Sequence, residues 1–200
     1  FPSPVADGAG LLLRWVDDNA QTYSPEQITG LDNVVISIIA TDTTSITRGA
    51  TWKFFDQGTN QGTAWRATSF DDSAWPSGNA ELGYADSPVT TLREGPDSAT
   101  TSVTKFITYY FRKHFTIADA SKVIGLRMSL ERDDGAVIYL NGSEIARSNM
   151  NAGTVDYLTN SAATVSGTDE TTYFPINLPF SNLVTGDNVI AVEVHQRDNA

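Results

Sequence analysis

The strongest constraint on the fold is a succession of short segments in which apolar and polar residues alternate. In the stretch GLRMSLE at 125–131 every second residue is apolar, and NVIAVEVHQ at 188–196 repeats the pattern. A β-strand points successive side chains to opposite faces, so both stretches are predicted to be half-buried antiparallel strands. KFITYYFRKHF at 105–115 is a third predicted strand. No long stretch keeps a helical period, and we expect little helix.

Turn dipeptides separate the predicted strands. In RDDGAVIYLNGSEIAR, Asn141-Gly142 follows an apolar run, and both residues tolerate the positive φ angles of a type I′ hairpin turn. Asp133-Asp134-Gly135, on the other side of that run, has the same turn chemistry. This region is therefore predicted to be a meander of three strands with two tight turns. The alternative for the paired aspartates is the start of a metal site.

The recurrence of such strands from Trp52 onward, with Gly, Asp, Asn and Ser clusters between them, predicts an all-β antiparallel sandwich over residues 49–200. Residues 1–48 differ in character and are interpreted as an N-terminal extension or the tail of a preceding domain. They include NVVISIIATDTTSIT at 33–47, a β-branched run typical of a strand. We expect this strand to pair with a sheet edge of its own domain or of a neighbouring copy.

The composition excludes several classes of function. The net charge of −11 and the pI near 4.4 would repel nucleic acid. The sequence has no cysteine, which excludes thiol catalysis and thiolate metal ligands. No apolar run approaches the roughly 20 residues of a membrane helix, so membrane insertion is not expected. Abundant Thr, Ser, Asn and Gly with little Lys is typical of an exported protein, and an extracellular or cell-surface location is expected.

Several motifs, taken in order, resemble a galactose-binding-like jelly-roll module of secreted multidomain bacterial proteins. The resemblance covers about residues 50–198 and rests on WKFFDQGTNQGTAWRATSFDDSAW, LGYAD, YYFRKHF, RDDGAVIYLNGSEIARSNM and GDNVIAVEVHQ. Related sugar-binding domains accompany β-galactosidase-type and rhamnosidase-type glycosidases, where the module is accessory and not catalytic. That family continues past VEVHQ with one more strand, so this chain is expected to lack the last family strand.

Exposed aromatic rings are the candidate carbohydrate platforms, because sugar faces stack on aromatic faces. Trp52 and Trp75 match positions that are structural in the resemblance. This leaves as candidates Trp65, Tyr84 and one of Tyr109 or Tyr110. The alternative for all of them is packing in the core.

Asp71 and Asp72, in SFDDSAW, are candidate calcium ligands, because loops of a jelly roll can converge several oxygens on one hard cation. The alternative is that they cap backbone N–H groups in a turn. No calcium loop of the D-x-[DN]-x-[DN]-G type occurs in the sequence, and no other cofactor is indicated.

His114 and His195 are the only histidines, and both occur within predicted strands. By alternation from the apolar residues of its strand, His195 is expected to point away from the buried face. Neither histidine accompanies a G-x-S-x-G or H-E-x-x-H motif, so no enzyme activity is predicted.

Two functional hypotheses remain. The first is a non-catalytic accessory module that binds carbohydrate or a cell-surface component within a larger secreted protein. The second is a structural or assembly module of an extracellular polymer or surface layer, whose sheet edges contact other copies or neighbouring domains.

Overall fold

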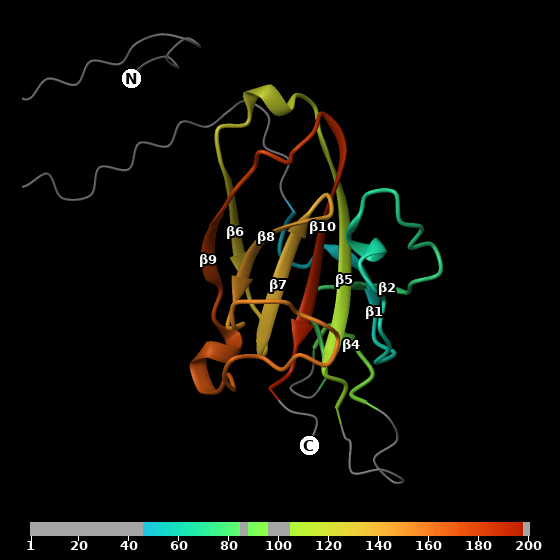
Figure 1. Cartoon of the computed structure of the whole chain (residues 1–200), viewed down its shortest axis with the longest axis vertical. Helices are drawn as coiled ribbons and strands as arrows, with labels where there is room; N and C mark the ends of the chain where they lie inside the picture. Colours follow the sequence, from blue (N-terminus) through green and yellow to red (C-terminus); the bar gives the residue numbers. More distant parts are fainter. Residues whose placement is uncertain (1–45, 85–87, 96–104, 198–200) are drawn as a thin grey trace, which may run out of the picture. The chain divides into compact units, whose positions relative to one another are not determined.

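The computed structural model describes residues 46–84, 88–95 and 105–197 (Figure 1). These residues form β-sheets joined by loops and short 3-10 helices, with no longer helix among them. Within this part of the chain, no helix is long and apolar enough to cross a membrane. The strand expected at 33–47 falls almost wholly outside the described residues, and its pairing stays a prediction.

The largest sheet has six strands in the order β2-β1-β5-β10-β7-β8. Their bounds are β1 Thr51–Phe55, β2 Ser77–Asn79, β5 Thr108–Ile117, β7 Gly135–Leu140, β8 Ser143–Ser148 and β10 Gly186–His195. All neighbours in this sheet are antiparallel. The central pair of long strands is in register from Gly186 opposite Ile117 to His195 opposite Thr108. Side chains of β5 and β10 therefore lie side by side along the middle of the sheet.

A second layer covers one face of this sheet. β6 (Leu126–Leu130) pairs antiparallel with β9 (Phe174–Leu178). Its alternate residues Leu126, Met128 and Leu130 pack against a core that includes Ile138 and Leu140 of β7 with Ile190 and Val192 of β10. The alternation predicted from GLRMSLE is confirmed, as is the all-β antiparallel sandwich. The jelly-roll and galactose-binding-like topology stays a prediction.

The shorter elements lie in the connections. They are the parallel pair β3 (Leu82–Gly83) and β4 (Thr90–Thr91), and the 3-10 helices η1 (Ala64–Arg66), η2 (Ala120–Lys122) and η3 (Gly167–Thr171).

The other face of the large sheet is covered as well, by loops instead of a sheet. Trp65 and Trp75, from the loop that follows β1, pack there against Tyr110 of β5, Tyr139 of β7 and Ala191 of β10. β7 is consequently buried along its whole length, and β10 is buried on both faces from 188 to 193. The prediction of a strand at 188–196 is correct, but the prediction that only one of its faces is buried is wrong. Alternation alone does not reveal the loops that cover the second face.

The turn prediction is right at one end of β7 and wrong at the other. Asn141 and Gly142 have φ angles of 50° and 91° and join β7 to β8 as a hairpin. Asp133 and Asp134 do not make a hairpin turn, because β6 pairs with β9 while β7 pairs with β10 and β8. This segment instead crosses between layers. Turn chemistry specifies a change of direction, but not the strand that is reached afterwards.

Close packing at Gly135 yields a stability prediction. A Cβ at this position would lie 2.7 Å from the backbone oxygen of Asn149 and 2.9 Å from the Cβ of Ser161, and backbone cannot move aside cheaply. We expect Gly135→Ala to lower the free energy of unfolding by about 1–3 kcal/mol, the usual cost of overpacking. Urea unfolding measures the change. Gly125→Ala is the control, because nothing lies within 4 Å of its Cβ position, and equal losses in the two variants would contradict the prediction.

Candidate functional site

Ionisable side chains line the loop-covered face of the large sheet. Arg112 of β5 and Glu193 and His195 of β10 alternate with residues that face the sandwich core, and their exposed fractions are only 0%, 2% and 0%. Buried ionisable groups are costly unless they are paired and hydrogen-bonded. The partners of these three side chains come largely from the covering loops, so the same groups hold the loops on the sheet.

Arg112 fixes the loop that carries η1. Its Nε donates to Asp72 Oδ2 at 2.8 Å. Its terminal nitrogens donate to the carbonyl oxygens of Trp65, of Ala67 at 3.0 Å and of Phe70 at 3.4 Å. One guanidinium thus gathers four acceptors from residues 65–72, and places η1 over the centre of the sheet.

His195 and its neighbour Thr108 fix a second loop. His195 Nδ1 lies 2.8 Å from the carbonyl oxygen of Thr159, and the Thr108 hydroxyl donates to the carbonyl oxygen of Tyr157 at 2.9 Å. The expectation that His195 points away from the core side of β10 is correct, but the loop buries it completely. A residue buried in this way cannot reach a substrate in solution.

Asp134 also holds the loop that follows β8. Its carboxylate accepts hydrogen bonds from the backbone N–H groups of Val165 and Arg197, both at 2.6 Å, and the residue is only 6% exposed. The loop that follows β8 is therefore tied to the sheet at both 159 and 165. Asp133 is the more exposed neighbour. Partial burial, together with a hydrogen bond and the charge of Asp134, raises the pKa of Asp133 to about 6.

Glu193 lies at the centre of this face. Its Oε1 accepts from the Tyr139 hydroxyl at 2.5 Å and from Arg66 Nη2 at 3.3 Å. The Arg66 guanidinium also lies 4.1 Å from the centre of the Tyr139 ring, a cation–π contact. The other oxygen, Oε2, lies 3.7 Å from His195 Nε2. That nitrogen is buried without a hydrogen-bond partner. The Glu193 carboxylate is therefore enclosed by protein groups, and only 2% of the residue is exposed.

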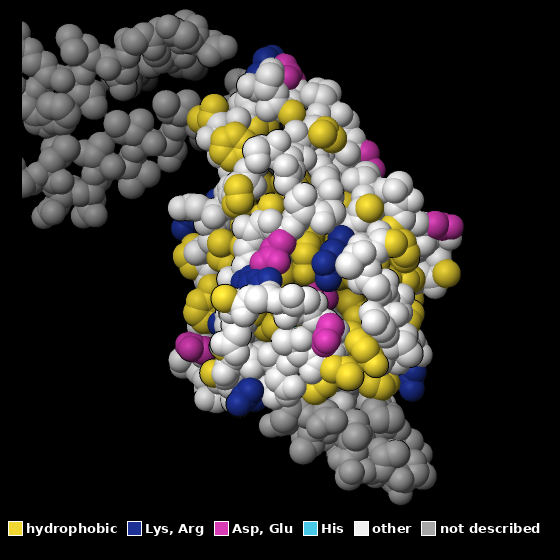
Figure 2. Space-filling model, viewed as in Figure 1, with side chains coloured by type: hydrophobic (Ala, Val, Ile, Leu, Met, Phe, Trp, Pro, Cys, Tyr) yellow, Lys and Arg dark blue, Asp and Glu magenta, His cyan; other side chains and the backbone are white. Residues whose placement is uncertain are grey.

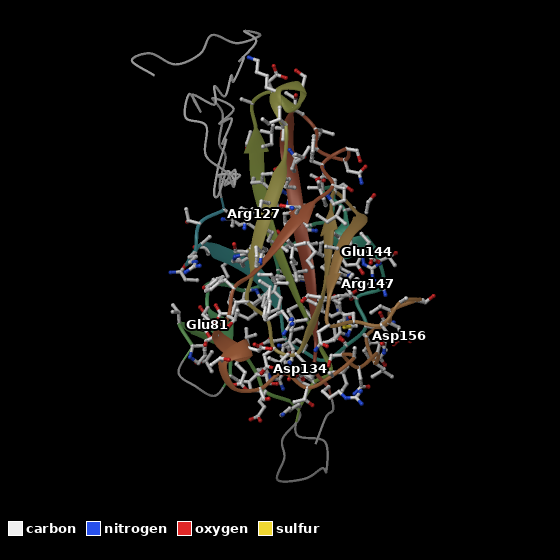
Figure 3. All side chains as sticks on the ribbon, turned by 90° about the vertical axis from the view of Figure 1, so that its left-hand side faces the viewer. Glu81, Arg127, Asp134, Glu144, Arg147 and Asp156 are labelled. Carbon is white, nitrogen blue, oxygen red and sulfur yellow. The ribbon has the colours of Figure 1, made fainter. Side chains whose placement is uncertain are left out.

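A pocket of about 170 Å³ opens above Glu193. Tyr110 and Glu193 form its floor, the segment 60–66 forms one wall, and the segment 155–157 forms the other. Figure 2 shows side chains of both charge signs gathered near the middle of this face. In Figure 3, Asp156 lies on the same side of the sheet as Glu144 and Arg147, and on the side opposite to Arg127 and Glu81. Asp156 and Asn60 are exposed at the rim, whereas Glu193 is buried.

Two of the candidate aromatic platforms, Trp65 and Tyr109, are packed in the core, which is the alternative that the sequence left open. Trp65 is fully buried and Tyr109 is 2% exposed, so neither ring offers a face to a sugar. Trp65 packs edge-on against Tyr110 and Tyr139 at centroid distances of 4.9 and 5.8 Å. Tyr84 is half-buried, and its hydroxyl donates to Gln196 at 2.7 Å. Burial raises the pKa of Tyr84, and its role in sugar binding stays a prediction.

Asp71 and Asp72 have protein partners. Asp71 Oδ1 accepts from the backbone N–H of Ser73 at 3.0 Å, the predicted turn cap. Hydrogen bonds from the Ser73 side chain and from this backbone N–H hold the pKa of Asp71 below its ordinary value. Asp72 pairs with Arg112, a cation that already compensates its charge. In the part of the chain that the structure describes, no group of three or more His, Asp or Glu side chains could hold a metal ion. Calcium binding stays a prediction without a ligand set.

His114 of β5 lies beside Arg112 on the loop-covered face, and its side chain is 38% exposed. Its Nδ1 lies 2.9 Å from Asp187 Oδ2, and its Nε2 lies 3.1 Å from an Arg112 nitrogen.

Sequence reasoning did not single out Arg66, Arg112 or Glu193. The available signal was a charged residue inside an otherwise apolar strand, as in YYFRKHF and IAVEV, where a buried partner is required.

Comparisons with known proteins concern the fold. No family model matches the chain, and no curated protein does. A structure of Bacteroides uniformis β-glucuronidase 2, covalently bound to cyclophellitol-6-carboxylate aziridine, is similar at 22% identity and a TM-score of 0.46, over 75% of this chain and 14% of that one. A β-glycosidase from Bacteroides vulgatus is similar at 19% identity and a TM-score of 0.46, over 74% and 16%.

A β-glucuronidase from an uncultured Clostridium species is similar at 18% identity and a TM-score of 0.43, over 74% of this chain and 21% of that one. The likeness is to a small part of each enzyme. The chain spans between 14% and 21% of the length of these solved structures.

The central role of Arg112 gives a second stability prediction. Arg112→Met keeps the length of the side chain but leaves Asp72 and three carbonyl groups without their donor. We expect a loss of about 3–5 kcal/mol in the free energy of unfolding, the cost of breaking a buried ion pair from one side. Chemical denaturation measures it. Arg127→Met, at an exposed position of β6, is the control and should change stability by less than about 0.5 kcal/mol. Similar small losses in both variants would contradict the account.

Asp133 gives a prediction about pH. The pKa of Asp133 in the folded state, about 6, lies above the ordinary value of 3.8. The contribution of its carboxyl group to the stability of the fold is therefore present at low pH and is lost as the pH rises through 6. We therefore expect Asp133→Asn to match the wild type near pH 4 and to have the higher melting temperature at pH 7.

Asp119→Asn is the control of opposite sign, because a hydrogen bond from Ser121 lowers the pKa of Asp119. Its melting temperature should not exceed that of the wild type at pH 7. A difference between Asp133→Asn and wild type that does not grow between pH 4 and pH 7 would refute the prediction.

Proposed function

We propose that this domain is a non-catalytic module that binds carbohydrate within a larger secreted protein. The observation that carries the proposal is the pocket above Glu193. Its floor presents Tyr110 and the ion pair of Glu193 with Arg66, and its rim presents the Asn60 amide and the Asp156 carboxylate. Sugar hydroxyl groups both donate and accept hydrogen bonds, so a mixed set of donors and acceptors on a small concave site suits them.

The size of the pocket supports a small polar ligand. A volume of about 170 Å³ is below the roughly 300 Å³ at which pockets for drug-sized ligands begin. One sugar unit at the end of a chain suits such a space better than an extended segment of polymer. The buried network of Glu193, Arg66 and Tyr139 holds the floor in place before a ligand arrives, which lowers the entropic cost of binding.

The arrangement supports binding more than hydrolysis. Glu193 already accepts two hydrogen bonds through Oε1, and Asp156 Oδ1 accepts from the backbone N–H of Leu158 at 2.9 Å. Both carboxylates are thus already engaged as hydrogen-bond acceptors by the protein itself, whereas a glycosidase needs a pair of carboxyl groups that act directly on the scissile bond.

Assembly is the second candidate. Within the described residues, β6 and β9 have only each other as strand neighbours, although they cover one face of a six-stranded sheet. Free strand edges can accept a strand from another chain. Light scattering of the full chain distinguishes the two functions, since assembly predicts a mass that rises with concentration and carbohydrate binding does not.

Calorimetric titration with a panel of neutral oligosaccharides tests the carbohydrate proposal. We expect binding by the full chain, and a loss of about tenfold or more in Arg66→Met, because hydrogen bonds to charged groups contribute about 1.5–3 kcal/mol. Asn60→Ala should lose several-fold in affinity, because a hydrogen bond between neutral groups contributes about 0.5–1.5 kcal/mol. Arg127→Met and Glu81→Gln, on the opposite side in Figure 3, are the controls and should bind normally. Binding that survives in both pocket variants, or no binding to any oligosaccharide, would contradict the proposal.

A further inference from the structure

The charges that line the pocket do not balance. One guanidinium, that of Arg66, faces two carboxylates, those of Glu193 and Asp156. The nearby Glu144 and Arg147 of β8 form an ion pair with each other and add no net charge. Tyr110 on the floor stays neutral, because burial raises its pKa to about 12. The pocket therefore carries one net negative charge, on a chain whose own net charge is −11.

Arg66 is moreover occupied by the protein. Its Nη2 pairs with Glu193 at 3.3 Å, and its guanidinium lies over the Tyr139 ring. Its Nε is buried without a partner, where a ligand cannot reach it. The Glu193 carboxylate therefore already compensates the charge of this guanidinium. By contrast, Asp156 is exposed at the rim, where its Oδ1 accepts from the Leu158 backbone N–H and the Thr159 hydroxyl, and no ion pair within the described residues compensates its charge.

We propose that this pocket accepts neutral or amino sugars and excludes acidic sugars, namely uronic acids and sulfated sugars. The inference rests on the proposed function and names the ligand class of the same site. A ligand carboxylate in the pocket would meet the uncompensated charge of Asp156 in a partly enclosed space, where repulsion between like charges is less screened than in bulk water. A ligand ammonium or hydroxyl would instead donate to the Asp156 carboxylate. Exclusion by like charge is a general route to specificity.

Matched sugars that share stereochemistry test this selectivity. Titrations of the full chain with the neutral hexose, the 2-amino sugar and the uronic acid of the gluco, galacto and manno series compare ligands that differ at one substituent. In the series that binds, the neutral sugar should bind at least about tenfold more tightly than the uronate, and the amino sugar at least as tightly as the neutral one.

Asp156→Asn removes one rim charge without touching the buried network, and should narrow the preference for neutral sugar over uronate by several-fold. Glu81→Gln makes the same change in net charge on the opposite side of the sheet and should leave the preference unaltered (Figure 3). The selectivity would be refuted if the uronate bound as tightly as the neutral sugar, or if Asp156→Asn and Glu81→Gln changed the preference equally. Either result would still be compatible with carbohydrate binding. Failure of every sugar to bind would overturn the proposed function, and this inference with it.

Discussion

The buried guanidinium of Arg112 is the interaction on which the described structure most depends. Removing such a charge from water costs several kcal/mol unless its donors are satisfied. Here Asp72 and the carbonyl oxygens of Trp65, Ala67 and Phe70 satisfy them, and all four acceptors lie in one loop. The guanidinium can be buried only if that loop folds down onto the sheet. Trp65 then fills the aromatic cluster, and the next residue forms a pocket wall.

The opposite wall is held by different groups on the same sheet. Thr108 and His195 are opposite each other on β5 and β10, and they bind the carbonyl oxygens of Tyr157 and Thr159. Asp134 holds the loop again through the backbone N–H of Val165. The two walls are thus fastened independently, with Glu193 between them on the floor. A site built on rigid strands in this way is pre-organised, which favours selective recognition of a small ligand.

Local features were predictable from the sequence, and features that depend on distant segments were not. The alternation of β6 and the Asn141-Gly142 hairpin depend on neighbouring residues alone, and both were predicted correctly. The Asp133-Asp134 segment was misread because turn chemistry is the same in a hairpin and in a crossover between layers. For Trp65 the sequence leaves both an exposed platform and core packing open, because it does not show that Arg112 holds the Trp65 loop on the sheet. The pocket depends on these long-range contacts and was therefore not predicted.

The most direct test of this account is a titration of the isotope-labelled chain with the neutral sugar, followed by amide chemical shifts. The account predicts that the shifted amides cluster in the segments 60–66 and 155–157 and around Glu193, the floor and walls of the pocket. The amides of η2, at one end of the sandwich, should not move. Shifts concentrated at η2 or along β6 and β9, with the pocket amides unchanged, would contradict the claim that the loop-covered face of the sheet is the binding site.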